Sequence, residues 1–537
     1  MSEKVTKNSR DYKARKKIDW RWLILGLVCV VAIAVAIVAN NRVGDDSTSK
    51  LLNRVVVDNS DLKVNWERYQ TVDMELTESL TITESGTYHL TGTLMDGQII
   101  VDAGVGEVRL VLDNVSITNS TGPAIVAYNA ENLVIELMGD NTLTDGASYD
   151  VKYDEDVDGA IYSKADLAFT GEGTLTIIAS HGDGIVGKDD VVTRGGVYKI
   201  TAIDDGVRGK DSVYITGGVL SIDAGGDAVK STNDTDYGKG FVMIEDGDFE
   251  LTTIGKGISA ENTILLYGGD LTLNTTDDAV HSNNYVGIVG GTLTIDSGDD
   301  GIHADNELIV DGGTIKITKS YEGVEAQVVT INDGVLDITA TDDGLNAGGG
   351  ADDSAINRPG ANSFAGDENC VLTINGGSVY VNSGGDGVDS NGYLIFNGGD
   401  TVVDGPTNNG NGALDAGLGI TIQGGSVIAV GSSGMAEGLG ADSGICNISV
   451  YFDTTEPAGT TIEIRNSSNE LVMSHTAIKS FSHLAAGSED LTLGETYTIY
   501  LDGVEYQQFT IAEVTTTLGN SRMGQPMMNS SGDPSRT

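Results

Sequence analysis

The chain has 537 residues, of which 79 are acidic and 31 basic, and its formal net charge at pH 7 is −48. Such an acidic surface excludes nucleic acid as a partner, because binding to phosphates requires a basic surface. Glycine is abundant (73 residues) and proline scarce (6), which is typical of many tight corners and not of a disordered linker.

The N-terminal region predicts a membrane anchor. Residues 1–21 hold eight basic residues against three acidic ones, and residues 22–39 form an uncharged apolar run. Such a run is just long enough to cross a bilayer as a transmembrane helix, with the basic flank in the cytoplasm. We therefore expect a single-pass cell-membrane protein with most of the chain outside the cell; a cleaved signal peptide is the alternative. Residues 40–69 are expected to form a polar tether.

A repeat of roughly 22 residues dominates the middle of the chain. Its marker is a pair of acids followed by Gly or Ala and then by Val, Ile or Leu, and the second acid advances by 22 residues from Asp183 to Asp205 and again to Asp227. A Gly-Gly pair keeps the same spacing, and a short alternating strand follows each pair. Complete copies of the acidic phrase occupy residues 204–207, 277–280, 299–302 and 342–345.

These repeats predict an all-β fold, a parallel β-helix over residues 70–445. Each repeat carries three short strands with period-2 alternation, and none contains a segment long enough for an amphipathic helix. The longest interruption, residues 344–385, is expected to be a loop that leaves one coil. Cys370 and Cys446 lie 76 residues apart without metal-ligand spacing, so their pairing stays open.

The repeat stops after Cys446. The following segments alternate like antiparallel strands, which predicts a small β module over residues 446–515. Such a module would close the open end of the solenoid, where strand edges and core are otherwise exposed. The tail, residues 516–537, is expected to be disordered.

The phased acids predict bound Ca²⁺. Equivalent positions of successive coils stack about 4.8 Å apart, where like charges repel unless a cation lies between them. Carboxylate oxygens grouped in this way suit Ca²⁺, which takes six to eight oxygen ligands. Corner chemistry is the alternative, because Asp-Gly turns form side-chain hydrogen bonds of their own. The predicted calcium ligands are Asp204, Asp205, Asp227, Asp277, Asp278, Asp299, Asp300, Glu322, Asp342 and Asp343.

A second stripe of side chains follows the acids. His281 and His303 occupy the same phase one coil apart and are expected to stack on an outer face of the solenoid. The stripe is compatible with a surface ladder without chemistry and with a surface that contacts a ligand. The residues expected at neighbouring positions of this phase are Lys230, Glu325, Asn346, Asp389 and Asp415.

Two phrases in successive coils resemble a known family. Residues 298–304, Gly-Asp-Asp-Gly-Ile-His-Ala, and residues 319–325, Lys-Ser-Tyr-Glu-Gly-Val-Glu, resemble the exported bacterial carbohydrate-binding β-helix family, formerly a domain of unknown function. Its characterised clostridial member binds cellulose and acidic pectic sugars. The resemblance covers roughly residues 70–450. It implies a right-handed β-helix with bound Ca²⁺, similar in architecture to calcium-dependent pectate lyases but without demonstrated lyase chemistry.

The leading hypothesis is therefore a monomeric, calcium-binding, non-catalytic cell-surface protein that binds plant-type or acidic polysaccharide. One alternative is a calcium-dependent pectate-type lyase, in which Lys210 or Lys230 would remove the proton alpha to a uronate carboxylate. Another alternative is a structural surface adhesin. No catalytic residue is assigned, and the candidate carbohydrate contacts are Lys230, His281, His303, Tyr321 and Glu325.

Overall fold

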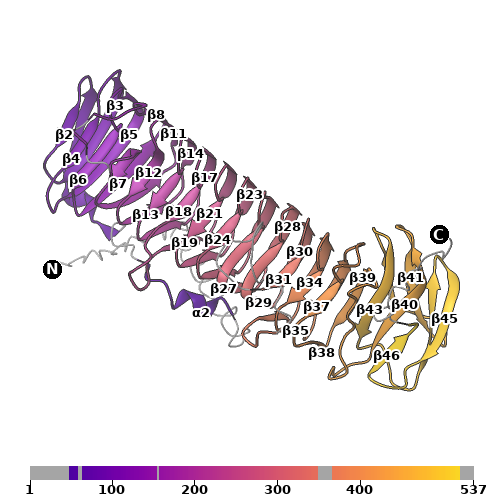
Figure 1. Ribbon diagram of the computed structural model, residues 1–537. Coiled ribbons are helices and arrows are strands. Elements are labelled where there is room, and N and C mark those ends of the chain that lie inside the picture. Colours follow the sequence, from indigo (N-terminus) through magenta and orange to yellow (C-terminus); the bar gives the residue numbers. More distant parts are fainter. Residues whose placement is uncertain (1–46, 58–62, 151, 154–155, 349–365, 521–537) are drawn as a thin grey trace, which may run out of the picture.

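The protein is a long solenoid with a β module at its C-terminal end (Figure 1). The computed structural model describes residues 47–57, 63–150, 152–153, 156–348 and 366–520. The predicted parallel β-solenoid is confirmed, with about 14 turns and almost no helix. Each regular turn contributes a strand to each of three parallel ladders, named here sheets 1, 2 and 3.

Sheet 1 contains the strand that precedes the Gly-Gly corner in each regular turn. In order along the solenoid, its strands are β1 (Thr71–Leu76), β3 (Gly86–Leu94), β5 (Glu107–Thr118), β7 (Asn132–Met138), β10 (Asp166–Gly171), β13 (Asp190–Thr193), β16 (Ser212–Ile215), β19 (Phe241–Ile244), β22 (Thr263–Leu266), β25 (Tyr285–Ile288), β27 (Ile302–Val310), β29 (Val324–Ile331), β32 (Val371–Ile374), β35 (Tyr393–Phe396) and β38 (Gly419–Ile422).

Sheet 2 shows the plainest alternation between buried and exposed side chains, because one of its faces lines the core and the other meets solvent. It begins with the C-terminal parts of β3 and β5. Its further strands are β8 (Asp140–Thr144), β11 (Thr174–Ala179), β14 (Val197–Ala202), β17 (Val219–Ala224), β20 (Asp248–Thr253), β23 (Asp270–Thr275), β26 (Thr292–Asp296), β28 (Thr314–Lys319), β30 (Val335–Ala340), β33 (Ser378–Ser383), β36 (Asp400–Asp404) and β39 (Ser426–Gly431).

Sheet 3 follows the acidic phrase and carries the candidate site. Most of its strands have three to five residues, and β27 and β29 run on from sheet 3 into sheet 1. Its other strands are β2 (Leu80–Ile82), β4 (Ile99–Asp102), β6 (Ile125–Asn129), β9 (Gly159–Ser163), β12 (Asp183–Gly187), β15 (Val207–Gly209), β18 (Val229–Ser231), β21 (Ile258–Ala260), β24 (Val280–Ser282), β31 (Leu345–Ala347), β34 (Val388–Ser390) and β37 (Leu414–Ala416).

Glycine is required at the corner between sheets 1 and 2. The second glycine of the pair has a positive φ, for example +89° at Gly291, which side chains rarely adopt. A Cβ atom at Gly291 would lie 2.7 Å from the carbonyl oxygen of Gly269 in the preceding coil. The corner therefore excludes a side chain for two reasons, backbone conformation and the close approach of the stacked coil.

The described part of the N-terminal segment packs on the solenoid and is not a free tether. Helix α2 (Ser49–Leu52) lies along sheet 1, and Leu51 is fully buried in a cluster with Leu265 and Ile309. The backbone N–H and the hydroxyl of Thr48 both donate to Asp311 Oδ2, at 2.8 and 2.7 Å. Residues assigned to a polar tether thus fasten the segment to the middle of the solenoid, because Leu51 and its neighbours cover apolar outer positions of sheet 1.

The predicted transmembrane segment, residues 22–39, lies outside the described residues. In the part of the chain that the structure describes, no helix is both long and apolar enough to cross a membrane. The short helix η2 (Trp66–Arg68) precedes β1. The membrane anchor over residues 22–39 therefore stays a prediction.

The interruption between 344 and 385 is not a loop throughout, so that prediction is wrong in part. β32 pairs with β29 in sheet 1, and β33 pairs with β30 in sheet 2, so both strands belong to an ordinary coil. The spacing of the acidic phrases does not reveal this coil, because extra residues between β31 and β32 lengthen the interval from one phrase to the next. Residues 349–365 lie outside the described residues. Cys370 and Cys446 are both free thiols.

The C-terminal strands cover the last coil. β43 (Phe481–Ser488) pairs antiparallel with β39 and with β40 (Asn447–Glu456), and β46 (Thr515–Leu518) pairs with β40. A four-stranded antiparallel sheet of β42 (Leu471–Thr476), β41 (Thr461–Asn466), β44 (Thr496–Leu501) and β45 (Val504–Thr510) completes the module. Its apolar cluster includes Ile428 and Val430 of β39, so the edge of sheet 2 is paired and its outer face is buried.

We expect Gly291→Ala to destabilise the protein more than Gly459→Ala. Gly459 has a similar φ, +90°, but a Cβ atom added there would have no other atom within 4 Å. The control variant Gly459→Ala should therefore lose only the free energy that a side chain costs at a positive φ, about 1–2 kcal/mol. Gly291→Ala adds the clash with the preceding coil, roughly 1–3 kcal/mol more. Denaturant unfolding of the two variants measures the difference, and equal losses would contradict the stacking argument.

Candidate functional site

A column of acids runs along the solenoid at the corner before sheet 3. In most coils one carboxylate oxygen accepts a hydrogen bond from the backbone N–H at the same position of the next coil. The Asp205 N–H donates to Asp183 Oδ1 at 2.9 Å, and the Asp300 N–H donates to Asp278 Oδ1 at 2.8 Å. This carboxylate column consists of Asp183, Asp205, Asp227, Asp278, Asp300, Glu322, Asp343 and Asp386, with Lys256 in the place of one acid.

A second column lies beside it on the outward side of sheet 3. The first residue of each strand enters the core and the second points outward, because side chains alternate along a strand. The strand register aligns these residues as the phase of the sequence predicts. This outer column consists of Arg208, Lys230, Ser259, His281, His303, Glu325, Asn346, Asp389 and Asp415.

In the N-terminal part of the site, basic side chains already pair with the acids. Arg208 bridges Asp183 and Asp158 of the two preceding coils. The ammonium of Lys230 lies 2.9 Å from Asp227 Oδ2 and 3.5 Å from Asp205 Oδ2. These contacts supply the positive charge that the stacked acids require.

Lys256 and His281 pair with Asp278 in the same way. The ammonium of Lys256 lies 2.8 Å from Asp278 Oδ2 and 3.0 Å from Asp277 Oδ1, and His281 Nδ1 lies 2.8 Å from Asp278 Oδ2. Burial opposes ionisation of Asp278, but His281 and Lys256 outweigh it and lower its pKa to about 2. Asp205, Asp227, Asp277 and Asp278, four of the predicted calcium ligands, therefore have cations from the protein itself.

His281 and His303 stack as expected, but not on an exposed surface. Their ring centroids are 4.9 Å apart and the rings are 9° from parallel, and the residues are only 5% and 1% exposed. Each ring packs against the acid three residues earlier, Asp278 or Asp300, and against the other ring. The two rings do lie in register on the outward side of sheet 3, but the expected exposure is wrong, because corner acids and stacked neighbours cover the imidazoles.

His303 supplies a positive charge to three carboxylates. Its Nδ1 lies 3.2 Å from Asp300 Oδ2 and 3.1 Å from Glu325 Oε2, and its Nε2 lies 3.2 Å from Asp305 Oδ1. Burial disfavours the imidazolium, but Asp300, Asp305 and Glu325 raise the pKa of His303 to about 12. His303 and Glu325, both 1% exposed, are therefore an internal ion cluster and lie out of reach of a polysaccharide in this conformation.

In the C-terminal coils the acids continue but the bases do not. Carboxylate oxygens of Asp386, Asp389 and Asp415 lie within 4.8 Å of one another. Among the described residues, no Lys, Arg or His side chain forms an ion pair with these three acids or with Asp343. Two oxygen-rich columns therefore converge here without an internal cation.

Burial and mutual repulsion raise the pKa values of the acids in these coils. Burial, with repulsion from Asp386 and Asp342, raises the pKa of Asp343 to about 8. Burial raises the pKa of Asp386 to about 7, and burial with repulsion from Asp343 raises the pKa of Asp389 well above its usual value. Burial also raises the pKa of two acids that do have a base, Asp183 beside Arg208 and Asp300 beside His303, to about 7. The C-terminal coils therefore differ from the others in lacking an ion pair with a base among the described residues, and not in the raised pKa values as such.

Asn346 adds a neutral oxygen to the same place. It stands in register between Glu325 and Asp389, and its Nδ2 donates to Glu322 Oε2 at 2.8 Å. Its Oδ1 is buried and, in the part of the chain that the structure describes, accepts no hydrogen bond. A buried acceptor without a partner costs about 1–3 kcal/mol. A cation beside Asn346 Oδ1 would remove this cost.

The remaining predicted residues lie at the rim of the columns. Tyr321 is partly buried, and a hydrogen bond with Asp342 raises its pKa. Asp204 is exposed, and Asp277, Asp299 and Asp342 are partly exposed. Asp204 lies in one acidic group with Asp183 and Asp205, and Asp299 lies in another with Asp277 and Asp278.

Of the four acids without an internal cation among the described residues, Asp343 was predicted as a calcium ligand, whereas Asp386, Asp389 and Asp415 were not. Asp389 and Asp415 were assigned to the outer stripe, and Asp386 lacks the second acid that marks the repeat phrase. Glu437, whose pKa is raised to about 7 by burial and by Asp415, belongs to the same group. After His303, no basic residue occupies the outer-column position of the repeat. This is the sequence feature that distinguishes the C-terminal coils.

Comparisons with known proteins identify the type of repeat. A sequence model of the family described as "Carbohydrate-binding domain-containing protein" matches residues 77–323 and 277–358. A protein of this description from Acetivibrio thermocellus is 37% identical over 161 residues, which cover 29% of this chain and 55% of the relative. The match thus spans about half of that relative's length.

A solved structure is also similar in sequence to part of this chain. It is described as the polysaccharide lyase-like protein from C. thermocellum, gadolinium derivative, and is 30% identical to this chain. The alignment covers 41% of this chain and 96% of the other, with a TM-score of 0.39.

We expect Lys256→Met to cost about 3–5 kcal/mol of unfolding free energy, because it removes a cation from the fully buried Asp278. Lys316→Met is the matched control, since the exposed pair of Lys316 and Asp337 contributes about 0–1 kcal/mol. Denaturant unfolding at pH 7 measures both.

The pH dependence provides a second check on the same pair. The lowered pKa of Asp278 stabilises the wild type above pH about 4, and this contribution disappears as the pH falls toward 2. The difference between wild type and Lys256→Met should therefore shrink in that window. A difference that is small at pH 7 or constant down to pH 2 would contradict the role of Lys256.

Proposed function

The chain belongs to the family of carbohydrate-binding domain-containing proteins, and on this basis we propose that it is a non-catalytic, calcium-binding protein that binds acidic polysaccharide. The observation that carries the proposal is the change along the carboxylate column. Basic side chains pair with the acids up to His303, whereas Asp343, Asp386, Asp389 and Asp415 have none among the described residues.

The residues of the C-terminal coils fit Ca²⁺. All donors are hard oxygens, and Ca²⁺ accepts six to eight such ligands in a flexible arrangement. Asp386, Asp389 and Asp415 would hold the ion, and Asn346 Oδ1 and Asp343 would stand beside it. When bound, Ca²⁺ would supply the positive charge that joins protein carboxylates to the carboxylates of a uronate chain.

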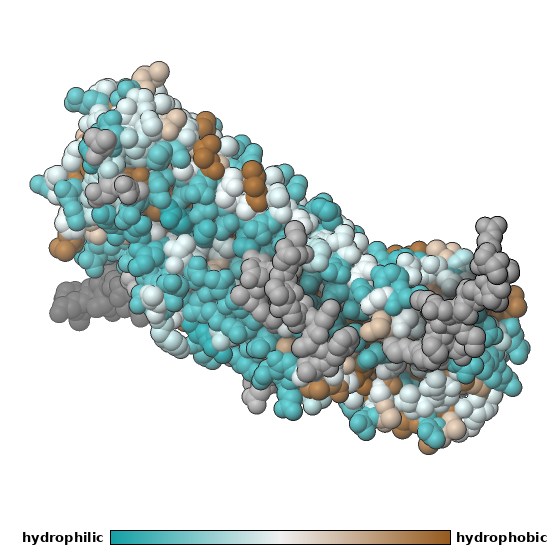
Figure 2. All heavy atoms as spheres, in the orientation of Figure 1, coloured by the Kyte–Doolittle hydropathy of each residue, from teal (hydrophilic) through white to brown (hydrophobic). Residues whose placement is uncertain are grey.

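Acidic polysaccharide is favoured over a crystalline, uncharged one. On the face shown in Figure 2, hydrophilic residues dominate the solenoid. Trp66 is the sole tryptophan of the described residues and packs against the cluster around Leu51. A flat platform of several tryptophans is therefore missing from the described surface, and charge bridging is the better-supported mode of recognition.

The surroundings of Lys230 support binding without lyase chemistry. Burial opposes its charge, but Asp205 and Asp227 raise the pKa of the amine. An ammonium held between two carboxylates donates protons and does not remove them from a sugar ring. Lys230 is thus better suited to neutralising the column than to acting as a base.

We propose an extracellular location at the cell surface. Calcium-binding modules outside the cell have dissociation constants of about 0.1–1 mM, so a modest site is filled there. The strongly negative net charge, −48, is compatible with this location because bound Ca²⁺ reduces the repulsion.

Calcium should stabilise the protein more at pH 8 than at pH 5. The raised pKa values, about 7 for Asp386 and about 8 for Asp343, mean that the native state binds more protons than the unfolded chain between pH about 4 and 8. Without metal, the unfolding free energy therefore falls as the pH rises through this window. Calcium at a hundredfold excess over its dissociation constant should restore about 2.7 kcal/mol, seen as a higher Tm than in chelator.

Asp389→Asn tests the assignment of this calcium site. It should raise the Tm in chelator at pH 8, because one repelling charge is removed, and should reduce the response to calcium. Asp270→Asn, on the exposed face of sheet 2, is the control and should keep the full response. Identical melting in calcium and chelator at pH 8, or equal responses of both variants, would count against the site.

Polygalacturonate should be retained by the protein in calcium and released by chelator. Asp389→Asn should abolish retention, and Asp270→Asn should preserve it. The soluble fraction should gain no ultraviolet-absorbing unsaturated chain ends. If such ends appear, and Lys210→Ala or Lys230→Ala abolishes them, the protein is a lyase and the non-catalytic proposal fails.

A further inference from the structure

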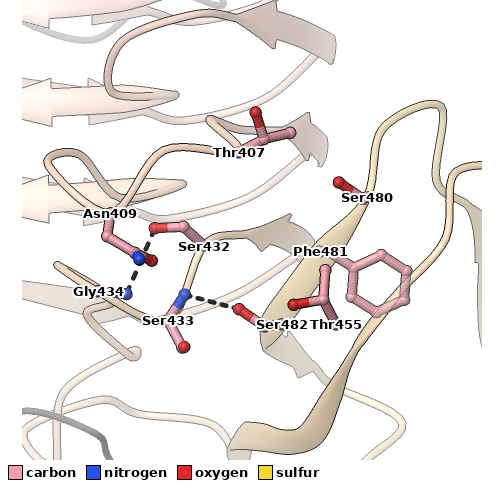
Figure 3. A pocket seen from close by; sticks show the side chains of 9 residues that line it. All are labelled: Thr407, Asn409, Ser432, Ser433, Gly434, Thr455, Ser480, Phe481 and Ser482. Atoms are coloured by element: carbon pink, nitrogen blue, oxygen red, sulfur yellow. Dashed lines mark hydrogen bonds between the residues drawn. The ribbon is translucent and has the colours of Figure 1, made fainter.

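A polar cavity lies between the last coils of the solenoid and the C-terminal module (Figure 3). Its volume is about 390 Å³, within the range of roughly 300–1,000 Å³ that is usual for small-molecule pockets. Thr407, Asn409 and Ser433 approach it from the solenoid, and Thr455, Ser480 and Ser482 approach it from the module. The cavity therefore exists only because the two parts are packed together.

Hydrogen bonds across the junction fix its walls. The Ser433 N–H donates to Ser482 Oγ at 2.9 Å, which joins the turn after β39 to β43. The Ser432 hydroxyl donates to the carbonyl of Asn411 at 3.0 Å, and the Ser432 N–H donates to the carbonyl of Pro406 at 2.9 Å. These contacts join the loop between β36 and β37, the turn after β39 and strand β43, so the lining groups are positioned before any ligand arrives.

The lining contains no charged side chain, although the protein carries a net charge of −48. Within the described residues, the hydroxyls of Ser433, Thr455 and Ser480 make no hydrogen bond to the protein. Ser433 is nevertheless only 5% exposed. Uncharged groups that both donate and accept are thus left available in a cavity that is partly open to solvent, since Thr455 and Asn409 at its edge are exposed.

The same lining excludes other ligand classes. A metal ion would find no carboxylate or imidazole among the lining residues, and a uronate would find no cation. An apolar ligand would find little surface, because the Phe481 ring is 1% exposed and packs on Phe452 with ring centroids 5.3 Å apart. The nearby Lys479 directs its ammonium to the carbonyl of Ser383 at 2.5 Å.

We propose that this cavity binds a neutral sugar unit independently of calcium, as a second binding site distinct from the carboxylate columns. A sugar ring presents hydroxyl groups that donate and accept in several directions, which is the chemistry that Ser, Thr and Asn side chains complement. The proposal rests on the proposed carbohydrate-binding function. The cavity lies outside residues 77–358, the part of the chain that the family match covers.

Thr455→Trp and Thr454→Trp form a matched pair for the test. Both residues are exposed on β40, but Thr455 lines the cavity, whereas Thr454 is not among its lining residues and its hydroxyl donates to Glu456. The larger side chain at 455 should fill the cavity, and the one at 454 should leave it open. Asn409→Ala, in an exposed loop, removes a lining group without filling space.

The measurement is calorimetric titration of the full chain, in chelator, with neutral tetrasaccharides of glucose, xylose, mannose and galactose units. At least one of them should bind. Thr455→Trp should weaken its affinity at least tenfold, Asn409→Ala about fivefold, and Thr454→Trp less than twofold. Absence of binding to all four, or equal effects of the two tryptophan variants, would overturn the proposal.

A second arm separates this site from the calcium site. Retention of polygalacturonate in calcium should be the same for Thr455→Trp and wild type, and Asp389→Asn should keep its affinity for the neutral tetrasaccharide. Loss of tetrasaccharide binding in Asp389→Asn would overturn the independence of the two sites. Failure of polygalacturonate retention alone, with the tetrasaccharide still bound, would overturn the calcium proposal and leave the cavity assignment intact.

Discussion

In-register stacking is the constraint on which the rest of this structure depends. Parallel coils about 4.8 Å apart bring equivalent residues of neighbouring turns into contact. At the corner before sheet 3 this residue is an acid, because its carboxylate accepts the N–H of the next coil, as Asp278 does from Asp300. The same geometry makes like charges neighbours. Every coil must therefore supply a cation, bind a proton or accept an ion from solution.

The protein meets this requirement differently along its length. Lys230, Lys256 and His303 occupy positions of the two columns and lie against the acids, so bases of the protein pair with the acids in this part of the site. Asp386 and Asp389 have no such partner among the described residues, and their pKa values are raised. A solenoid built from one repeat thus combines coils whose acids pair with bases of the protein and coils whose acids have no such base among the described residues.

The β module that closes the C-terminal end of the solenoid creates an environment different from that of the two columns. The edge of sheet 2 pairs with β43, and the outward residues Ile428 and Val430 enter the apolar cluster of the module. Loops from both parts meet at this junction, and their short polar side chains leave a cavity without charge. The two proposed modes of recognition therefore arise in two different places. Charge bridging arises where acids stack without a base, and neutral hydrogen bonding arises where the module closes the open end of the solenoid.

The sequence by itself determined the solenoid, its period and the alignment of its columns, because the repeated phrases show which residues stack. The register from Lys230 to Asp415 follows from aligning the phrase before sheet 3, even where the step between copies is longer than 22 residues. It did not reveal that His281 and His303 are buried, or that β32 and β33 form a regular coil within a lengthened step. Nor did it reveal which acids have partners, or that loops far apart in the chain enclose a cavity. Only the tertiary structure decided these points, because burial and charge pairing depend on side-chain contacts between coils, which periodicity does not specify.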